Sequence, residues 1–275
     1  MTGWRGAVGA GVLAACGPSP VDDGGRRDRT LLEITLPATH NAMSNADDGW
    51  ALPNQQHPIA RQLDDGVRGM LIDTYAWQGE PYLCHGYCEL GATPLAAALD
   101  DLRAFLEREP EEIVVLIIQD ALSIAETQLA FDAAGLLGRA LAPPATGEPW
   151  PTIGEMIDAD RRLVVTRESG GPGPAWFPPF YDVGFDTPYE FRSVDAFSCD
   201  VLRGSGDHDL FLVNHWVEDP FPSEANAAAA NAADVLRARI DACEAERGHR
   251  VNLLAVDGYA VGDLLQVVAE RNARD

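Results

Sequence analysis

The chain has 275 residues, of which 46% are hydrophobic and 23% are charged, an ordinary composition for a globular protein. This length suits one large α/β domain or two small ones, with enough residues for a sizeable core. The 43 acidic residues outnumber the 20 basic ones, and the formal net charge of −23 disfavours nucleic acid as a partner. All the basic residues are Arg, so a Walker-type phosphate-binding lysine, a Schiff-base lysine and a Ser–Lys dyad are excluded.

The first 16 residues have the pattern of an export signal. One positive charge at Arg5 precedes a small apolar run over residues 7–15, which is too short to span a bilayer and fits a signal-peptide core. The run ends in Leu-Ala-Ala before Cys16, a pattern that resembles the bacterial lipobox, in which the cysteine is lipidated. The alternative is a simple secretory signal with Cys16 incidental. We therefore expect an exported lipoprotein of the bacterial cell envelope, held to a membrane through Cys16 on the periplasmic or extracellular face.

Residues 17–30 contain Gly, Pro and charged residues with almost no apolar content. This composition predicts a flexible tether between the anchor and a domain that covers residues 31–275.

From residue 31 onward, short apolar runs alternate with helical patterns. The candidate strands cover residues 32–38, 67–74, 113–119, 163–167, 210–214 and 251–256. The candidate helices cover residues 59–65, 94–108, 123–141, 225–246 and 261–271. Continuous apolar strands such as IVVLII are typical of a parallel sheet covered by helices on both faces. The sequence therefore predicts an α/β fold, a single (β/α) barrel of the TIM type that is closed or distorted.

Residues 169–209 interrupt this alternation with a loop-rich insertion of Gly, Pro and aromatic residues. A long irregular segment in a compact domain is often functional. Within it, the run WFPPFY over residues 176–181 is interpreted either as a loop that contacts lipid or as a loop core that folds back on itself.

Four cysteines remain after Cys16, an even number for the oxidising compartment that export implies. Their spacing does not resemble a zinc site. Cys84 and Cys88 are close enough to close a small loop around His85, provided that Gly86 permits a turn. We expect the bridges Cys84–Cys88 and Cys199–Cys243, although the sequence leaves other connectivities open.

Polar residues follow the predicted strands. The first strand runs into His40 and Asn41, the second reaches Asp73 and leads through a short spacer to His85, and the last ends in Asp257. Barrel enzymes place their chemistry at the C-terminal ends of strands. Two imidazoles that titrate near neutrality suit a general base and a general acid.

Six segments in this order resemble the X-domain phospholipase C-like phosphodiesterases, the superfamily of bacterial phosphatidylinositol-specific phospholipase C, over most of residues 31–272. The segments are ATHNAMSN, QLDDGVRGMLIDTYAWQGEPYLCHGYC, EIVVLIIQD, WPTIGEMIDADRRLVV, LFLVNHW and NLLAVDGYAVGDLLQVV. Each motif alone is weak, but their order and spacing together are specific. The resemblance implies a TIM barrel and a phosphoric diester hydrolase that cleaves a phospholipid or a related phosphodiester.

The resemblance also implies roles for individual residues. His40 matches the base that takes the proton from the inositol 2-hydroxyl, which then attacks the phosphorus and gives a cyclic phosphodiester. His85 matches the acid that protonates the departing diacylglycerol oxygen. Asp257 matches the residue that holds the first histidine in its working tautomer, although a strand-end Asp can equally cap the next helix. Asn41 and Asp73 match positions that bind the metal in calcium-dependent relatives.

The sequence departs from both electrostatic schemes of this superfamily. Metal-independent bacterial relatives have an Arg two residues after the Asp73 position, where this chain has Tyr75. Calcium-dependent relatives have acidic residues where this chain has Leu71 and Gln119. A developing phosphorane needs positive counter-charge, so another group must supply what the missing Arg or the fully ligated calcium supplies in those relatives.

Two sources of counter-charge follow from these departures. One is a bound Ca²⁺, or Mg²⁺, held by Asn41 and Asp73. The other is an arginine elsewhere, at Arg68 or Arg167. Because they lie at or just after predicted strand ends, we expect Arg167, Asn214 and Tyr259 to contact the substrate.

Two other functions stay open at this point. One is a barrel that binds a phosphoinositide or sugar phosphate without turning it over, which the missing charged positions suggest. The other is a metal-dependent glycerophosphodiesterase-like enzyme, which usually has Glu-x-Asp after the second strand. Here that Glu position is Leu71.

Overall fold

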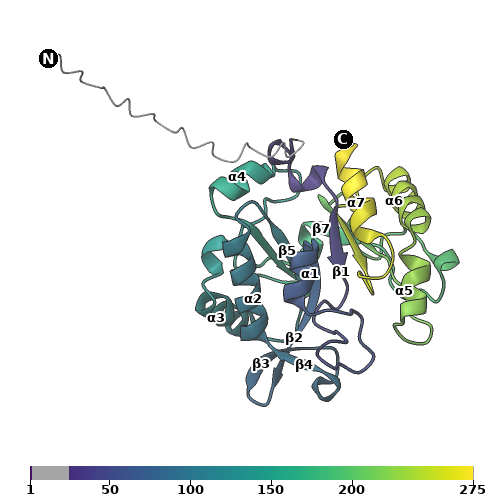
Figure 1. Cartoon of the computed structure of the whole chain (residues 1–275), viewed down its shortest axis with the longest axis horizontal. Coiled ribbons are helices and arrows are strands. Elements are labelled where there is room, and N and C mark those ends of the chain that lie inside the picture. The colour runs from purple at the N-terminus through teal and green to yellow at the C-terminus, as the bar shows by residue number, and fades with distance from the viewer. Residues whose placement is uncertain (2–24, 275) are drawn as a thin grey trace.

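Parallel strands curled on themselves form the centre of the protein (Figure 1). The computed structural model describes residue 1 and residues 25–274. The parallel strands are, in spatial order, β6 (Leu163–Arg167), β5 (Val114–Asp120), β2 (Gly69–Trp77), β1 (Leu36–Thr39), β10 (Leu253–Val256), β9 (Leu210–Asn214) and β7 (Gly184–Asp186). The antiparallel strands are β3 (Glu80–Cys84) and β4 (Ala92–Pro94), which extend the sheet beside β2, and β8 (Arg203–Gly204), which pairs with β7.

The barrel is open on one side. Among the named strands of the described residues, β6 pairs with β5 alone, whereas β7 pairs with β8 and β9, so no ladder joins β6 to β7. The prediction of a distorted TIM-type barrel is confirmed.

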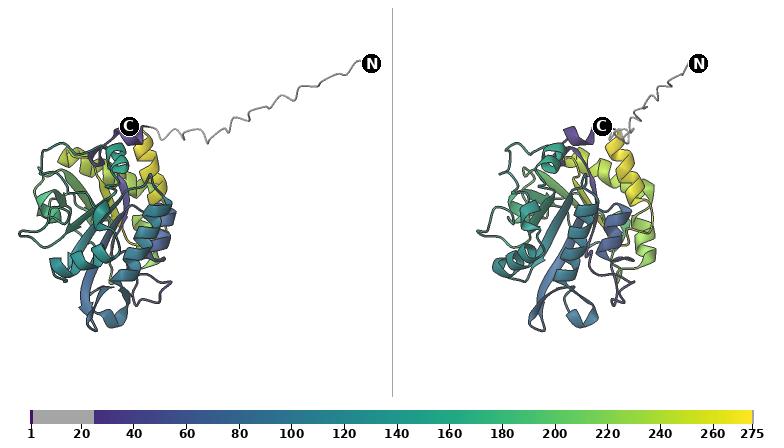
Figure 2. Two further views of the ribbon diagram at one scale, coloured as in Figure 1. Left: turned by 90° about the vertical axis from the view of Figure 1, so that its left-hand side faces the viewer. Right: turned by 60° about the vertical axis from the view of Figure 1, so that its left-hand side comes forward.

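Helices cover the outside of the curled sheet (Figures 1 and 2). They are α1 (Ile59–Asp65), α2 (Leu95–Arg108), α3 (Ile124–Ala133), α4 (Ile153–Asp158), α5 (Glu224–Ala230), α6 (Ala233–Arg247) and α7 (Leu264–Ala273). In α2 the buried residues recur every three or four positions, as an amphipathic helix requires. Among the described residues, no helix combines the length and the apolar content needed to cross a bilayer.

Alternation along each strand divides the core into two parts. On β2, Met70 and Ile72 pack in the cluster beneath the helices, whereas Leu71 packs in the cluster inside the barrel. On β6, Leu163 and Val165 face the helices and Val164 faces inward. Successive side chains of a strand point to opposite faces. The same alternation therefore continues past the end of each strand and determines which of the following side chains point into the barrel.

Several predicted boundaries differ from the structure. The first strand begins at Leu36 because Leu31–Glu33 form a 3₁₀ turn, which a capping box between Thr30 and Glu33 closes. The predicted helix 123–141 ends at Ala133, shortly before Gly135 in the left-handed region. The predicted helix 225–246 is two helices, α5 and α6. The insertion 169–209 is not wholly irregular, because it contains β7, a strand of the barrel itself.

Part of the predicted tether, residues 25–30, belongs to the folded domain. Arg26 forms an ion pair with Glu112 at 3.0 Å, and Thr30 forms a β-bridge with Thr152. Residues 25–30 are thus part of the folded domain, at the end of the barrel where the strands begin. Cys16 and the rest of the predicted signal and tether lie outside the described residues.

The structure contains both expected disulfides, Cys84–Cys88 and Cys199–Cys243. The second bridge ties the loop-rich insertion to α6. Within that insertion, Phe177 and Phe180 are fully buried, so the run 176–181 is a loop core and not a lipid-contacting loop.

We predict that the two bridges contribute unequally to stability. The separation is 44 residues for Cys199–Cys243 and 4 for Cys84–Cys88, which corresponds to about 4 and about 2 kcal/mol in the chain-entropy account. Chemical denaturation of Cys199→Ala/Cys243→Ala and of Cys84→Ala/Cys88→Ala measures both losses. An equal or larger loss in the second variant would contradict this ranking.

Candidate active site

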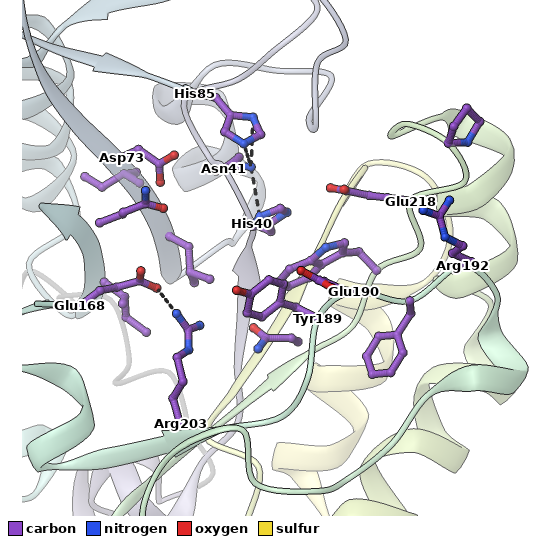
Figure 3. A pocket seen from close by; sticks show the side chains of 18 residues that line it. His40, Asn41, Asp73, His85, Glu168, Tyr189, Glu190, Arg192, Arg203 and Glu218 are labelled. Atoms are coloured by element: carbon purple, nitrogen blue, oxygen red, sulfur yellow. Dashed lines mark hydrogen bonds and ion pairs between the residues drawn. The ribbon is translucent and has the colours of Figure 1, made fainter. Parts of the chain in front are cut away.

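A pocket of about 560 Å³ opens where the parallel strands end (Figure 3). Its lining includes His40, Asn41, Asp73 and His85, which lie at or after β1, β2 and β3. The lining also includes residues 189–192, Arg203, Trp216 and Glu218, which come from the insertion and the loop after β9. This volume lies in the usual range for a small-molecule site.

His40 is held at three points directly after β1. Its backbone N–H donates to the Val256 carbonyl oxygen at 3.0 Å, which extends the pairing of β1 with β10 by one residue. Its Nδ1 lies 2.9 Å from Oδ1 of Asp257, and the Asn54 amide donates to both oxygens of that carboxylate at 3.1 and 3.2 Å. The ring stacks on Trp216 with centroids 3.8 Å apart and planes 6° from parallel. The imidazole therefore has a fixed orientation, in which Nδ1 faces Asp257 and Nε2 faces the Asn41 amide.

Asn41 connects the two histidines. Its Nδ2 lies 3.0 Å from Nε2 of His40 and 3.4 Å from both ring nitrogens of His85. The two imidazole centroids are 6.5 Å apart, with the planes at 76° (Figure 3). A donor amide facing Nε2 fits the tautomer in which Nδ1–H of His40 donates to Asp257. Asn41 has φ of 46°, the left-handed conformation that Asn tolerates well, where the chain turns at the end of β1.

The two histidines differ in proton affinity. Burial lowers the pKa of His40, but the charge of Asp257 and the hydrogen bond to it raise it more, with help from Glu218 and Asp73, so the net shift is upward. For His85, burial and the neighbouring His40 lower the pKa, and Asp257 opposes them only in part. The proton therefore favours His40 over His85.

Oxygen-bearing side chains follow neighbouring strands on the inner face. Asp73 of β2 lies opposite Gln119 of β5 in the parallel register, and Glu168 follows β6 next to it. The pKa of Asp73 is raised to about 7, mainly by burial; the charge of His40 opposes the rise and that of Glu168 adds to it. Together with Asn41, these groups offer the carboxylate and carbonyl oxygens that Ca²⁺ and Mg²⁺ prefer. The donor set fits a hard divalent cation.

Arg203 is more buried than Arg192, the other arginine that lines the pocket, and it forms ion pairs with carboxylates. Its guanidinium forms an ion pair with Glu168 at 3.1 Å (Figure 3). It forms a second ion pair with the fully buried Asp186 at 2.5 Å. It also lies over the rings of Tyr181 and Tyr189. Two carboxylates more than neutralise its single charge.

The pocket is therefore acidic. Arg192, the other arginine of the lining, forms an ion pair with Asp219 at 3.3 Å. The ion pairs of residues 25–274 leave Asp73, Glu190 and Glu218 with no arginine partner. Glu218 lies near His40 and Asp257, and the three offer potential metal-ligand atoms within 4.8 Å of one another. Because Asp257 already accepts hydrogen bonds from His40 and Asn54, this trio is better described as a carboxylate–histidine pair with a second acid beside it.

The structure corrects two of the expected substrate contacts. Arg167 is 1% exposed and donates to the carbonyl oxygens of Phe177, Ser169, Gly170 and Gly171. Arg167 occupies a position of β6 whose side chain points out of the barrel, so it is absent from the lining of the pocket. The hydroxyl of Tyr259 donates to Asp65 at 2.8 Å, away from the pocket. Arg68 pairs with Glu112 near the start of β5 and is not part of the site.

Asn214 does line the pocket, as expected. Its amide donates to Asp186 at 3.2 Å and to the Thr187 carbonyl oxygen at 2.6 Å, so it supports the wall that carries Arg203.

Sequence reasoning missed four groups of the site: Asn54, Glu168, Arg203 and Glu218. Glu168 could have been predicted, because it directly follows the predicted strand 163–167 at a position whose side chain points into the barrel. The other three lie in loops or in the two-residue strand β8, where the sequence has no periodicity to interpret.

Comparisons with known proteins identify the family and the fold. The family model described as PI-PLC X matches residues 27–272. The chain belongs to the PI-PLC X family. Relatives include a PI-PLC X domain-containing protein of Arabidopsis thaliana, 29% identical over 249 residues, and PI-PLC X domain-containing protein 1 of Arthroderma benhamiae, 29% identical over 266 residues. An uncharacterized secreted protein of the same fungus is 27% identical over 203 residues.

Coverage of these PI-PLC X relatives varies. The matches take in 82%, 89% and 68% of this chain, and 58%, 85% and 45% of the respective relatives. The chain thus spans little more than half the length of the Arabidopsis protein. Among solved structures, the phosphatidylinositol-specific phospholipase C of Listeria monocytogenes matches with a TM-score of 0.62 at 17% identity, covering 90% of this chain and 94% of that one. This match establishes the shared fold.

We predict that Asp257→Asn lowers the pKa of His40. The carboxylate charge that raises this pKa is lost, whereas burial, which lowers it, remains. NMR titration of the His40 ring protons, assigned against His40→Ala, measures the shift. Asp65→Asn, which removes a carboxylate outside the pocket, is the control, and an unchanged pKa in Asp257→Asn would contradict the pairing.

Proposed function

We propose that the protein is a phosphodiesterase that cleaves a phospholipid or a related phosphodiester by general acid–base catalysis, with His40 as the base and His85 as the acid. One observation carries the proposal. Two imidazoles border the same pocket, and Asp257 occupies Nδ1 of His40, so that Nε2 is the nitrogen available to a substrate. Membership of the PI-PLC X family supports a phospholipid-type substrate.

The proposed reaction needs two proton transfers. Nε2 of His40 accepts the proton of a headgroup hydroxyl as its oxygen bonds to phosphorus. The bond from phosphorus to the departing alcohol breaks, and His85 gives that oxygen a proton. The product is a cyclic phosphodiester. If water then opens the ring, His85 accepts the water proton and His40 returns one to the leaving hydroxyl.

The pKa shifts of the two histidines constrain this reaction. Catalysis needs neutral His40 and protonated His85, whereas the shifts favour the reverse arrangement. The productive form is therefore a minority at every pH, and the rate has a bell-shaped pH dependence whose two limbs belong to the pair.

A divalent cation completes the electrostatics of the proposal. A phosphodiester brings negative charge into a pocket in which Asp73, Glu190 and Glu218 have no arginine partner. Asn41 and Asp73, with Gln119 and Glu168 beside them, would hold the ion. Bound there, Ca²⁺ supplies positive charge to the non-bridging phosphate oxygens.

We also propose that the protein is exported. Two disulfides favour an oxidising compartment, and one relative is described as secreted. Lipidation of Cys16 and a place in a bacterial envelope stay predictions, since the relatives named above are plant and fungal proteins.

Replacing either histidine is expected to lower kcat by about 10²- to 10⁴-fold without unfolding the protein. The measurement is release of diacylglycerol and headgroup phosphate from phosphatidylinositol by His40→Ala and His85→Ala. His249→Ala, at the opposite end of the barrel, is the matched control. If the unaltered protein binds the substrate but does not turn it over, the binding-only barrel is correct instead.

Chelation with EDTA is expected to abolish activity, and added Ca²⁺ to restore it. Asp73→Asn is expected to raise the Ca²⁺ concentration needed by about tenfold or more, because one charged ligand is lost. The control is Asp132→Asn, on the exposed face of α3. Full activity after exhaustive chelation would contradict the cation and leave the counter-charge to an arginine, of which the pocket lining holds Arg192 and Arg203.

A further inference from the structure

Two carboxylates and two aromatic rings form a part of the pocket lining that we call the acidic wall. Its members are Tyr189 and Glu190 of the insertion and Trp216 and Glu218 of the loop after β9. The rings of Tyr189 and Trp216 stack with centroids 6.3 Å apart and planes 22° from parallel. The backbone N–H of Glu218 donates to the Phe191 carbonyl oxygen at 2.9 Å. These contacts join the two segments into one surface.

The carboxylates of the acidic wall have no positive partner among residues 25–274. Arg192, their neighbour in the chain, forms its ion pair with Asp219 at 3.3 Å, and no hydrogen bond within these residues reaches the side-chain oxygens of Glu190 or Glu218. Burial raises the pKa of Glu218, and nearby carboxylates add to the rise against the charge of His40. A half-buried carboxylate beside other carboxylates is stabilised by a cation that pairs with it.

A deeply buried carboxylate faces the same pocket. Asp73 is 5% exposed, lines the pocket, and has no hydrogen-bond or ion-pair partner in the described part of the chain. Asn214 also lines the pocket, and its buried Oδ1 accepts no hydrogen bond from those residues. All these oxygens are acceptors. A complementary ligand therefore donates hydrogen bonds and carries positive charge.

A neutral polyol meets only half of this requirement, because its hydroxyls donate hydrogen bonds but carry no charge. The non-bridging oxygens of a phosphodiester only accept, and they bring negative charge. An ammonium group supplies several N–H donors together with a positive charge. The rings of Tyr189 and Trp216 limit the access of water to the adjoining carboxylates, which strengthens such a pair.

The acidic wall lies beside His40, which fixes where the ammonium group is on the substrate. Potential ligand atoms of His40, Glu218 and Asp257 lie within 4.8 Å of one another. Figure 3 shows the carboxylate of Glu218 pointing toward His40. In the proposed reaction His40 takes the proton of the headgroup hydroxyl, and His85 faces the departing alcohol. An ammonium group held by Glu218 therefore belongs to the headgroup, close to the attacking hydroxyl.

We propose that Glu190 and Glu218 select a phospholipid whose polyol headgroup carries an ammonium group close to the attacking hydroxyl. The proposal rests on the proposed function for which part of the substrate is the headgroup. Glu190 and Glu218 determine specificity, because they bind a group that does not react. A glycerol headgroup that carries an amino acid in ester linkage has this chemistry, since its central hydroxyl lies between the phosphate and the ester.

Calorimetric titration with two short-chain phosphonates tests the acidic wall without turnover. In each, a methylene group replaces the departing oxygen, so that bond cannot be cleaved. One carries an alanyl ester on its glycerol headgroup, and the other a propionyl ester, which differs only in lacking the ammonium group. Below about pH 7, where the amino group is charged, the parent is expected to bind the alanyl ligand at least about tenfold more tightly. Equal affinities would overturn the proposal.

Charge-removing variants locate the preference. Glu190→Gln/Glu218→Gln is expected to lose it, because both charges are removed and the side-chain size is kept. Glu190→Gln alone, a change at an exposed residue, is expected to lose part of it. Glu80→Gln/Glu89→Gln, which removes the same charge from exposed residues outside the pocket, is the matched control. A preference that persists in Glu190→Gln/Glu218→Gln would overturn the proposal.

Ca²⁺ provides a second test of the acidic wall. Saturating Ca²⁺ is expected to leave the preference in place, because Asn41 and Asp73, which would hold the ion, lie outside the wall. Loss of the preference in Ca²⁺ would overturn the proposal, since Glu190 and Glu218 would then belong to the metal. The proposed function fails separately, when the cleavable phospholipid is not turned over although the preference between the phosphonates is intact.

Discussion

The two-residue repeat of the parallel strands determines what this pocket contains. His40, Asp73, Gln119, Glu168, Asp186, Asn214 and Asp257 all lie on the inward parity at or just beyond the end of a strand. Because the strands are parallel, these ends meet at one edge of the sheet. Hydrogen bonds along β1 and β10 fix the relative height of His40 and Asp257. The acid–base pair is thus a property of the strand register, and the loops refine it.

The loops supply what the strands do not. Asn54 orients Asp257, Trp216 supports the ring of His40, and the bridged loop presents His85. The insertion contributes Arg203, but Glu168 and Asp186 hold its charge. A site with this excess of carboxylates favours ligands that carry or recruit positive charge. The electrostatics therefore differ from a scheme with a free arginine beside the second strand, as the presence of Tyr75 indicates.

Much of this arrangement was predictable from the sequence, where periodicity is strong. The strands 163–167 and 210–214 and the helix 59–65 have the predicted bounds, and the polar residues after the strands come together as the barrel requires. Arg167 shows the limit of that reasoning. A shift of one position along a strand reverses the face, so Arg167 points outward and Glu168 inward. Arg203 was beyond prediction, because its position depends on β8 pairing with β7 across a loop without periodicity.

The position of residues 25–35 has a consequence for orientation. These residues precede β1, so they lie at the end of the barrel opposite the pocket. The nine residues from Gly17 to Gly25 reach at most about 30 Å when extended, and a globular domain of this size is about 45 Å across. A lipid on Cys16 would therefore hold the pocket facing away from the membrane that carries the anchor. Such a protein would act in trans, on a second lipid surface opposite its own, and the gap between the two surfaces would limit its activity.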